Sequence, residues 1–258
     1  MKTHGNYGKL WCERYGADRE LYKRFSMDKY IQISNYLGKS GVLLDVGCGF
    51  GDALYHFQDK FDDLIGIDPS SEMIDICAYN IKHRNIRARV AQGMCESLNF
   101  SNHTFNTVML LDVFEHFHAD SLSKALSEIN RVLRTKGELI IVTPSRSMIK
   151  FWSYFDNTLV KLLVNRKRSI FSLPKKKHTE IFYSKKEVID FVRYQGFTLK
   201  KFKRISFYPA PERLGVLNRI WRRVYRFKFV RSFVKGLFVL AESIPFLRQK
   251  MFFVFVKS

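Results

Sequence analysis

The chain has 258 residues but only four cysteines, which are scattered along its length. No two of them form a C-x-x-C pair, and residues 1–10 are polar where a secretory leader would be apolar. These absences argue against a disulfide framework, a zinc site and a signal peptide. We therefore expect reduced thiols in a cytoplasmic protein.

An apolar run long enough to cross a membrane is also missing from the C-terminal part. Residues 234–246 are strongly apolar, but Lys235, Glu242 and Pro245 interrupt them. A spanning helix needs about 20 predominantly apolar residues, so this stretch is too short and too broken for one.

Acidic residues are scarce in the same part of the chain. Residues 1–145 hold 17 Lys/Arg and 18 Asp/Glu, whereas residues 146–258 hold 27 and 6, so that the whole excess of +20 lies in the second part. Such a basic field attracts polyanions, either nucleic acid or an anionic lipid surface. A basic surface that only keeps the protein soluble is the alternative.

A glycine-rich turn follows a short apolar run. Residues 42–46 are typical of a buried strand, and residues 52–57 of the first turns of a helix. Gly47, Gly49 and Gly51 alternate between them. Glycine permits positive φ and lets a ligand approach the backbone. Exposed amides at the helix start favour a negative or electron-rich group.

Asp45 precedes these glycines and completes the pattern D-x-G-x-G-x-G. A dinucleotide-binding turn has G-x-G-x-x-G instead, and the acid would repel a pyrophosphate. The pattern resembles the first motif of the class I S-adenosylmethionine-dependent methyltransferases. The resemblance implies that Asp45, Cys48 and the three glycines contact S-adenosyl-L-methionine. A structural turn in another α/β protein is the alternative.

A second apolar run, residues 64–67, ends at Asp68, which lies 17 positions after Gly51. Ligands of open α/β sheets bind at the carboxyl ends of the strands, and an acid at about this spacing accepts the ribose hydroxyls. This is the second feature that resembles the methyltransferases, and it implies cofactor contacts for Asp68 and Pro69. A strand-end aspartate that caps a helix is the alternative.

Residues 92–100 follow a third expected strand, residues 86–91, and resemble the family's G-D-A-E-x-L-P-F stretch. In the family, the aspartate and a neighbouring amide contact adenine. Here Met94 replaces the acid. The resemblance implies that Met94 packs on the adenine ring and that the Cys95 amide supplies the polar contact. Glu96 matches the family and is assigned to the cofactor site.

Residues 105–111 are the fourth expected strand, and its last residue, Leu111, is also assigned to the cofactor site. The following D-V-F-E-H contains Asp112, Glu115 and His116 and resembles the D/E-x-x-E-H of ubiquinone-pathway O-methyltransferases. Three roles stay open. His116 is a general base toward an acceptor hydroxyl, the three side chains hold a divalent metal, or Glu115 and His116 only brace the loop.

The remaining core elements are predicted from periodicity, caps and turn residues. Gly137 is expected in the left-handed position after a helix. Strands that alternate with helices predict a parallel sheet of βα units. The family resemblance, which covers residues 42–145, implies an antiparallel hairpin at the end. The expected helices are residues 70–81, 120–133 and 184–194, and the further strands are 138–142, 198–207 and 251–256.

Two segments lie outside this pattern. An amphipathic helix over residues 21–37 either caps the active site or packs on the sheet. Residues 208–250 separate the last two strands and alternate aromatic with Arg/Lys residues at helical spacing. That pattern suits an interfacial position on anionic lipid, and a lid folded onto the core is the alternative.

We expect one α/β domain, residues 1–258, with a Rossmann-like doubly wound sheet that is mostly parallel, an antiparallel last strand and a helical insert between the last two strands. Its parts are cap helices 1–40, a cofactor core 41–145, the second half of the sheet in 146–207 and 251–258, and the insert 208–250.

The predicted function is methyl transfer from S-adenosyl-L-methionine to an oxygen of a small or lipid-linked acceptor, with contact to the inner face of a membrane through the basic insert. An RNA methyltransferase and a non-catalytic cofactor-binding protein are the alternatives. The chain has no N-P-P-Y tetrad for base amines and no recognisable RNA-binding module, which weakens the RNA interpretation. The sequence predicts no oligomeric state.

Overall fold

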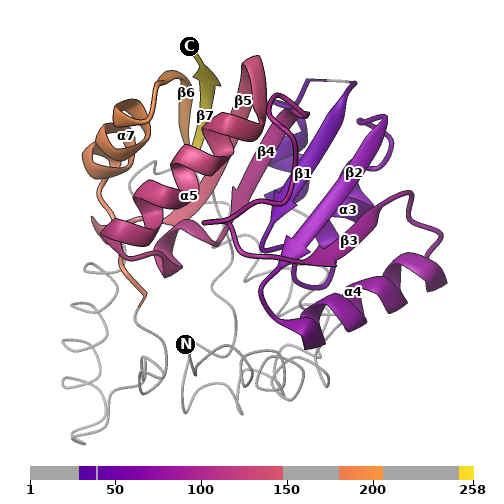
Figure 1. The fold of residues 1–258 in the computed structure, drawn as a ribbon. Coiled ribbons are helices and arrows are strands. Elements are labelled where there is room, and N and C mark those ends of the chain that lie inside the picture. Colours follow the sequence, from indigo (N-terminus) through magenta and orange to yellow (C-terminus); the bar gives the residue numbers. More distant parts are fainter. Residues whose placement is uncertain (1–28, 39, 148–179, 206–249) are drawn as a thin grey trace, which may run out of the picture.

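The computed structural model describes residues 29–38, 40–147, 180–205 and 250–258 (Figure 1). They form a seven-stranded sheet in the order β3-β2-β1-β4-β5-β7-β6. Helices lie on both faces of this sheet (Figure 1). The doubly wound α/β fold is therefore confirmed.

The first five strands are parallel to one another, and the last two are antiparallel to their neighbours. The strands are β1 Val42–Val46, β2 Asp63–Asp68, β3 Arg89–Gln92, β4 Phe105–Leu111, β5 Leu133–Pro144, β6 Phe197–Ile205 and β7 Lys250–Lys257. The helices are α3 Asp52–Phe57, α4 Ser71–His83, the short 3₁₀ helix η1 Phe114–His116, α5 Ala119–Val132 and α7 Lys185–Tyr194. Residues 29–34 are also helical.

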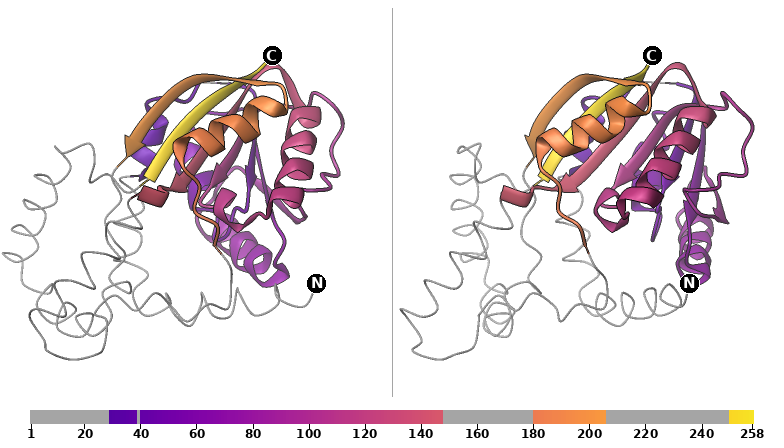
Figure 2. Two further views of the ribbon diagram at one scale, coloured as in Figure 1. Left: turned by 90° about the vertical axis from the view of Figure 1, so that its left-hand side faces the viewer. Right: turned by 60° about the vertical axis from the view of Figure 1, so that its left-hand side comes forward.

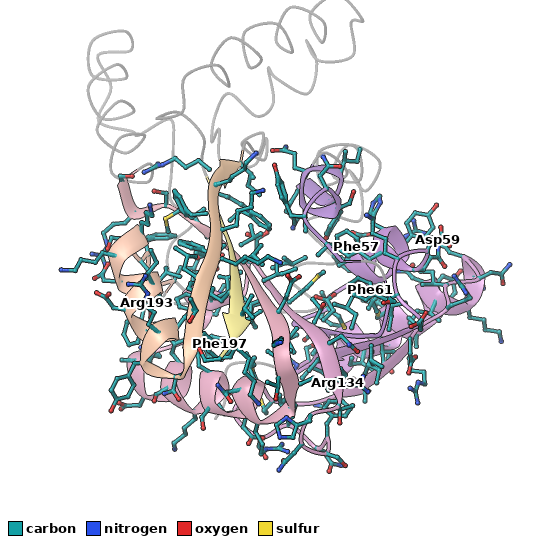
Figure 3. All side chains as sticks on the ribbon, turned by 90° about the horizontal axis from the view of Figure 1, so that it is seen from above. Phe57, Asp59, Phe61, Arg134, Arg193 and Phe197 are labelled. Atoms are coloured by element: carbon teal, nitrogen blue, oxygen red, sulfur yellow. The ribbon has the colours of Figure 1, made fainter. Side chains whose placement is uncertain are left out.

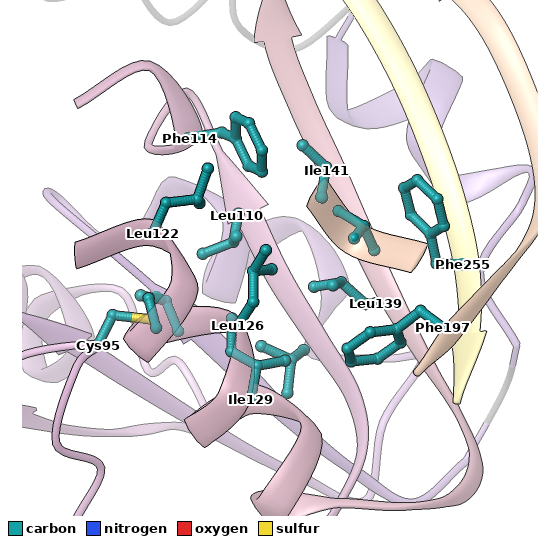
Figure 4. Packing of buried hydrophobic residues seen from close by; sticks show 14 of the residues in the cluster. Cys95, Leu110, Phe114, Leu122, Leu126, Ile129, Leu139, Ile141, Phe197 and Phe255 are labelled. Carbon is teal, nitrogen blue, oxygen red and sulfur yellow. The ribbon is translucent and has the colours of Figure 1, made fainter. Parts of the chain in front are cut away.

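The sheet separates two apolar cores, which explains why its central strands are continuous apolar runs rather than alternating ones. Side chains of α5 and α7 fill one core. Side chains of α3, α4 and residues 29–37 fill the other. Figure 4 shows the first core, where Leu122, Leu126 and Ile129 of α5 meet the β4 and β5 side chains. Their spacing places them on one face of the helix.

The end of α3 and the turn after it alternate between buried and exposed side chains. Phe57 and Phe61 are buried, whereas Asp59 between them is exposed. Figure 3 shows all three at this end of the molecule. Predicted caps also form: Ser70 accepts the Met73 amide at the start of α4, and Ser184 and Glu187 form the capping box of α7.

The last two strands extend the sheet beyond β5, and the end of the chain forms the strand next to the edge. β7 lies between β5 and β6, antiparallel to both (Figure 2). Because β7 runs opposite to β5, its first residue, Lys250, pairs with Pro144 at the end of β5. Lys250 therefore lies at the same edge of the sheet as the carboxyl ends of the parallel strands.

Two strand starts differ from the prediction by three residues or more, and one turn position also differs. β5 starts at Leu133 rather than residue 138, directly after α5, and β3 starts at Arg89 rather than residue 86. Lys136, with φ 62°, takes the left-handed position that was predicted for Gly137. Gly137 is required for space instead, because a Cβ there would lie 2.8 Å from the Arg134 carbonyl oxygen.

The insert expected at 208–250 falls almost entirely outside the described residues, as does the first part of the helix expected at 21–37. The division of the whole chain into one domain stays a prediction. Among the described helices, none combines the length and apolar character that a membrane span requires.

Candidate functional site at the carboxyl edge of the sheet

The order of the strands reverses between β1 and β4, which is where open α/β sheets have their ligand-binding crevice. The chain runs from β1 outward to β2 and β3, and then returns to β4 on the other side of β1. Loops that leave two such neighbouring strands diverge, and ligands of open α/β sheets bind at this switch point. The glycine turn, residues 47–51, leaves β1 here, and Asp112 follows β4.

The three glycines of the glycine turn are all left-handed, with φ of 71°, 51° and 79°. A Cβ on Gly47 would lie 2.5 Å from Val113 Cγ2, and one on Gly51 would lie 2.7 Å from Cys77 Sγ. At Gly49 the nearest atom would be Met73 Cε at 3.5 Å, an ordinary contact. Packing therefore requires glycine at 47 and 51, whereas the backbone at Gly49 is open to a ligand.

Asp68 at the end of β2 is tied to the glycine turn. The Gly49 amide donates to its Oδ2 at 3.1 Å, and the Ser70 amide donates to Oδ1 at 2.9 Å. The Gly93 amide donates to the Asp68 carbonyl at 3.1 Å, which brings the stretch around Met94 to the same place. Each carboxylate oxygen can accept more than one hydrogen bond. The structure thus assembles three segments that the sequence assigned to one site.

Asp45 is buried beneath the glycine turn. The pKa of its carboxyl is raised to about 7, mainly by burial. The charge of Lys29 lowers this pKa, and the charges of Asp68 and Asp52 raise it. Near neutral pH this carboxyl is therefore close to the midpoint of its titration. A cationic ligand group beside it would favour the ionised form.

Three other residues were assigned to the cofactor site, namely Cys48, Pro69 and Leu111. In each, the side chain or the carbonyl contacts other residues of the protein. The Cys48 thiol is buried against that of Cys77, and their hydrogen bond together with burial raises the pKa of Cys48. The Pro69 carbonyl accepts Gln92 Nε2 at 2.9 Å. Leu111 is buried at the end of β4.

The three residues from the stretch predicted to face adenine, residues 94–96, have different surroundings. Met94 is 38% exposed beside the end of β2, although it is apolar. The Cys95 thiol is buried, which raises its pKa. Glu96 lines an open polar hollow together with Ser123 and Glu128 of α5. Of these three residues, Met94 thus leaves an apolar side chain open to solvent.

Asp112, Glu115 and His116 do not act as one group. Asp112 is paired with two lysines, Lys29 and Lys250. Glu115 is buried and accepts the Thr143 hydroxyl at 3.1 Å, and burial together with Asp112 raises its pKa to about 8. His116 is exposed at the end of η1. Within the described ranges, no three His, Cys, Asp or Glu side chains are grouped to hold a metal ion.

Lys29, Thr143 and Lys250 lie at this site although the sequence pattern did not assign them to it. The signal for Lys250 was present, because the first residue of an antiparallel last strand must lie at the carboxyl edge of the parallel strands. The signal for Thr143 was its place at the end of a parallel strand. Lys29 gave no comparable signal, since its position depends on how a separate helix packs.

Part of the chain is similar in sequence to known methyltransferases. Residues 43–137 match a protein-family model described as a methyltransferase domain. The chain is 35% identical to an uncharacterised protein of Methanocaldococcus jannaschii over 43% of its length and 45% of that protein. It is 29% identical to a demethylmenaquinone methyltransferase of Bacteroides fragilis over 64% of its length and 71% of that protein.

A solved structure shares the fold. It is described as that of an S-adenosylmethionine-dependent methyltransferase of Methanosarcina mazei and superposes with a TM-score of 0.59 at 16% identity, covering 87% of this chain and 96% of that one. At this identity the similarity concerns the fold alone. The alignment with the Methanocaldococcus protein spans less than half of that relative.

Proposed function

We propose that this chain, in which residues 43–137 match a methyltransferase domain, transfers a methyl group from S-adenosyl-L-methionine to an oxygen of a small or lipid-linked acceptor. One observation carries the proposal. At the switch point of the sheet, the open Gly49 backbone and the Asp68 carboxylate are held 3.1 Å apart, N to Oδ2, by their own hydrogen bond. Backbone without a side chain beside a strand-end acid suits a ribose.

The residues of the site fit this cofactor. Asp68 would accept the ribose hydroxyls, and the Gly49 backbone would lie against the ligand. Asp45 would face the cationic amino group of the methionine part, and Met94 would cover the adenine with the Cys95 amide beside it. When bound, S-adenosylmethionine supplies a methyl group that is activated by a positively charged sulfur.

The protein's own part in the reaction is to position the acceptor and to exclude water. In our proposal His116, exposed at the end of η1, removes the proton of the acceptor hydroxyl as a general base. Glu115 follows Asp112 by three residues and accepts the Thr143 hydroxyl at the end of β5. It would keep this loop in place rather than react.

A lipid-linked acceptor is supported by two observations. The Bacteroides relative is named for demethylmenaquinone. The basic excess of residues 146–258 would also bring an acceptor at an anionic membrane surface to the protein. We propose that the insert 208–250 supplies this contact and that the protein acts at the inner face of the membrane.

The test is a transfer assay with labelled S-adenosylmethionine and separated lipid and water-soluble fractions of cell extract. We expect label in a lipid or small-molecule fraction. The label should be in a methyl ether, which is stable to base and thereby identifies oxygen as the methylated atom. His116→Asn should lower kcat at pH 7 and remove the fall in rate at low pH that protonation of a general base causes. Label that enters RNA alone would overturn the proposal, as would the absence of transfer to every fraction.

Membrane contact needs a separate measurement. Flotation with vesicles that contain 30% anionic lipid and a mobility shift with RNA, each at rising salt, compare the two polyanions. We expect flotation that salt reverses. Deletion of residues 210–248 should abolish flotation and leave cofactor binding intact; retained flotation would contradict the assignment to the insert.

A further inference from the structure

The short turn that begins at Met94 is held at both of its ends. Within the turn, the Ser97 amide donates to the Met94 carbonyl at 3.2 Å, and the two residues form an antiparallel bridge. Before it, the Gly93 amide donates to the last carbonyl of β2 at 3.1 Å. After it comes Leu98, whose backbone is bonded to side chains of α5. The placement of the turn therefore depends on what holds Leu98.

Two residues of α5 hold Leu98. Glu128 Oε2 accepts the Leu98 amide at 2.8 Å, and Arg131 Nη2 donates to the Leu98 carbonyl at 2.8 Å. The two side chains are also bonded to each other, Nε to Oε1 at 2.7 Å and Nη2 to Oε2 at 2.9 Å. They lie three positions apart and so share one face of the helix. Both backbone groups of Leu98 are thus bonded to a single bidentate ion pair.

The guanidinium of Arg131 uses all of its N–H groups in this region. In addition to its bonds with Glu128 and Leu98, Nη1 donates to the Phe100 carbonyl at 2.7 Å and to Asn102 Oδ1 at 2.9 Å. Arginine has five N–H donors in a fixed planar fork, and here each donor has its own acceptor. Lysine has three donors on one atom and cannot span these acceptors. One side chain therefore fixes the course of the chain after the turn.

Helix α5 is a firm support for this ion pair. Its inner face is completely buried in the first apolar core by Leu122, Ala125, Leu126, Ile129 and Val132. Cys95 and Leu98 belong to the same core, and Figure 4 shows Cys95 at its margin. Groups held by a packed element keep their geometry more closely than groups on a loop. The turn is thus anchored in the core while the Met94 side chain is 38% exposed.

The ion pair is better suited to fixing geometry than to stabilising the fold. The side chains of Arg131 and Glu128 are 32% and 24% exposed, and ion pairs with access to solvent contribute little to stability. The hydrogen bond from Arg131 lowers the pKa of Glu128, burial raises it, and the bond from the Leu98 amide lowers it. Glu128 is therefore ionised at neutral pH, and its bonds to Leu98 and Arg131 are of the strong, charge-assisted kind.

We propose that Arg131 and Glu128 are positioning residues for the adenine end of the cofactor site and that they set how strictly the site selects adenine. The inference rests on the proposed function, in which Met94 covers the base and the Cys95 amide contacts its edge. Holding Leu98 orients that amide, which lies three residues earlier in the turn. A hydrogen bond weakens steeply when its angle is poor. A loosened turn therefore loses its preference between bases, because that preference depends on the hydrogen bond.

The test uses three variants of the full-length protein. Arg131→Lys keeps the positive charge and removes the planar fork. Glu128→Gln keeps an oxygen acceptor for the Leu98 amide and removes the charge, so it is the milder variant and replaces Arg131→Lys if that protein does not fold. Arg134→Lys is the matched control, because Arg134 is exposed and donates to the His103 carbonyl at 3.2 Å, beyond the residues that the Arg131 side chain holds.

Calorimetry compares S-adenosylhomocysteine with S-inosylhomocysteine, whose base has an oxygen in place of the amino group and a hydrogen on a ring nitrogen that is an acceptor in adenine. We expect the wild type to prefer S-adenosylhomocysteine. In Arg131→Lys its affinity should fall about fivefold or more, and that for S-inosylhomocysteine less, so that the preference narrows. Glu128→Gln should narrow the preference in the same direction, and Arg134→Lys should keep the wild-type ratio.

Four results would count against these roles. Affinities that fall by the same factor for both ligands indicate a general loss of structure and overturn the positioning role, as do unchanged affinities in folded variants. The same narrowing in Arg134→Lys, or a wild type that binds both ligands equally, also overturns it. A wild type that binds neither ligand overturns the proposed function instead.

Discussion

The two sides of the crevice are built in different ways. On the β1 and β2 side, the glycine turn and Asp68 offer backbone amides and acids that lie within 27 residues of sequence, from 42 to 68. On the β4, β5 and β7 side, Asp112 after β4 pairs with Lys29 and with Lys250 at the start of β7, which are far from it in sequence. A contiguous motif can be identified by its spacing, whereas an assembled site becomes visible only when the sheet is folded.

The largest effect expected on the glycine-turn side comes from Asp68→Ala. The substitution removes the acceptor of the Gly49 and Ser70 amides and the proposed partner of the ribose hydroxyls. We expect S-adenosylhomocysteine affinity to fall about a hundredfold, from the loss of hydrogen bonds to a charged group. Calorimetry measures it.

Asp63→Ala is the control for that experiment. Asp63 begins the same strand, at the opposite edge of the sheet, and its exposed pair with Arg89 contributes little. Equal loss of affinity in the two variants would mean that the change acts through β2 as a whole and not through the crevice.

The glycines themselves should separate stability from binding. Gly47→Ala places a Cβ against Val113 in a left-handed conformation, so we expect a loss of unfolding free energy of about 3 kcal/mol. Gly49→Ala meets no close neighbour, so it should cost about 1 kcal/mol of stability and weaken cofactor binding. Urea unfolding and calorimetry on both variants check this. The reverse order of the two stabilities would refute the division between packing and ligand approach.

Asp45 should make stability depend on pH. The unfolded carboxyl ionises near pH 4, and the folded one near pH 7 because it is buried. Between these values the unfolded state binds fewer protons, so stability falls as the pH rises from 4 to 7. Asp45→Asn should remove this fall and be about 2 kcal/mol more stable than the wild type at pH 8.

The same variant tests the role of Asp45 toward the ligand. S-adenosylhomocysteine carries a cationic amino group and should favour the ionised carboxyl, so its affinity for the wild type should rise from pH 6 to pH 7.5. Asp45→Asn should bind weakly with no such rise. An identical pH profile in both proteins would exclude Asp45 as the group responsible.

The smallest effect is expected on the β4, β5 and β7 side, at Glu115. Burial and Asp112 raise its pKa to about 8, so the side chain is neutral at pH 7 and Glu115→Gln should change stability by less than about 1 kcal/mol there. Above pH 8 the wild type must ionise a buried acid, so the variant should become the more stable of the two. Urea unfolding at pH 7 and pH 9 distinguishes this from a Glu115 that is ionised at both.

The features set by local sequence could be predicted, whereas those set by distant contacts could not. The boundaries of β1 and β4 and the caps Ser70 and Ser184 follow from local apolar runs and capping residues, and the structure confirms them. The position of Gly137 was misjudged, because the absence of a loop between α5 and β5 depends on tertiary packing. The convergence of Lys29 and Lys250 on one carboxylate could not be predicted, since no local pattern records contacts over 83 and 138 positions.

The most direct test of the central claim is a calorimetric titration of the full-length protein with S-adenosyl-L-methionine at pH 7.5. We predict one site per chain with micromolar affinity, and displacement of the bound ligand by S-adenosylhomocysteine. No detectable binding at millimolar ligand would contradict the account of the glycine turn and Asp68 as a methyl-donor site.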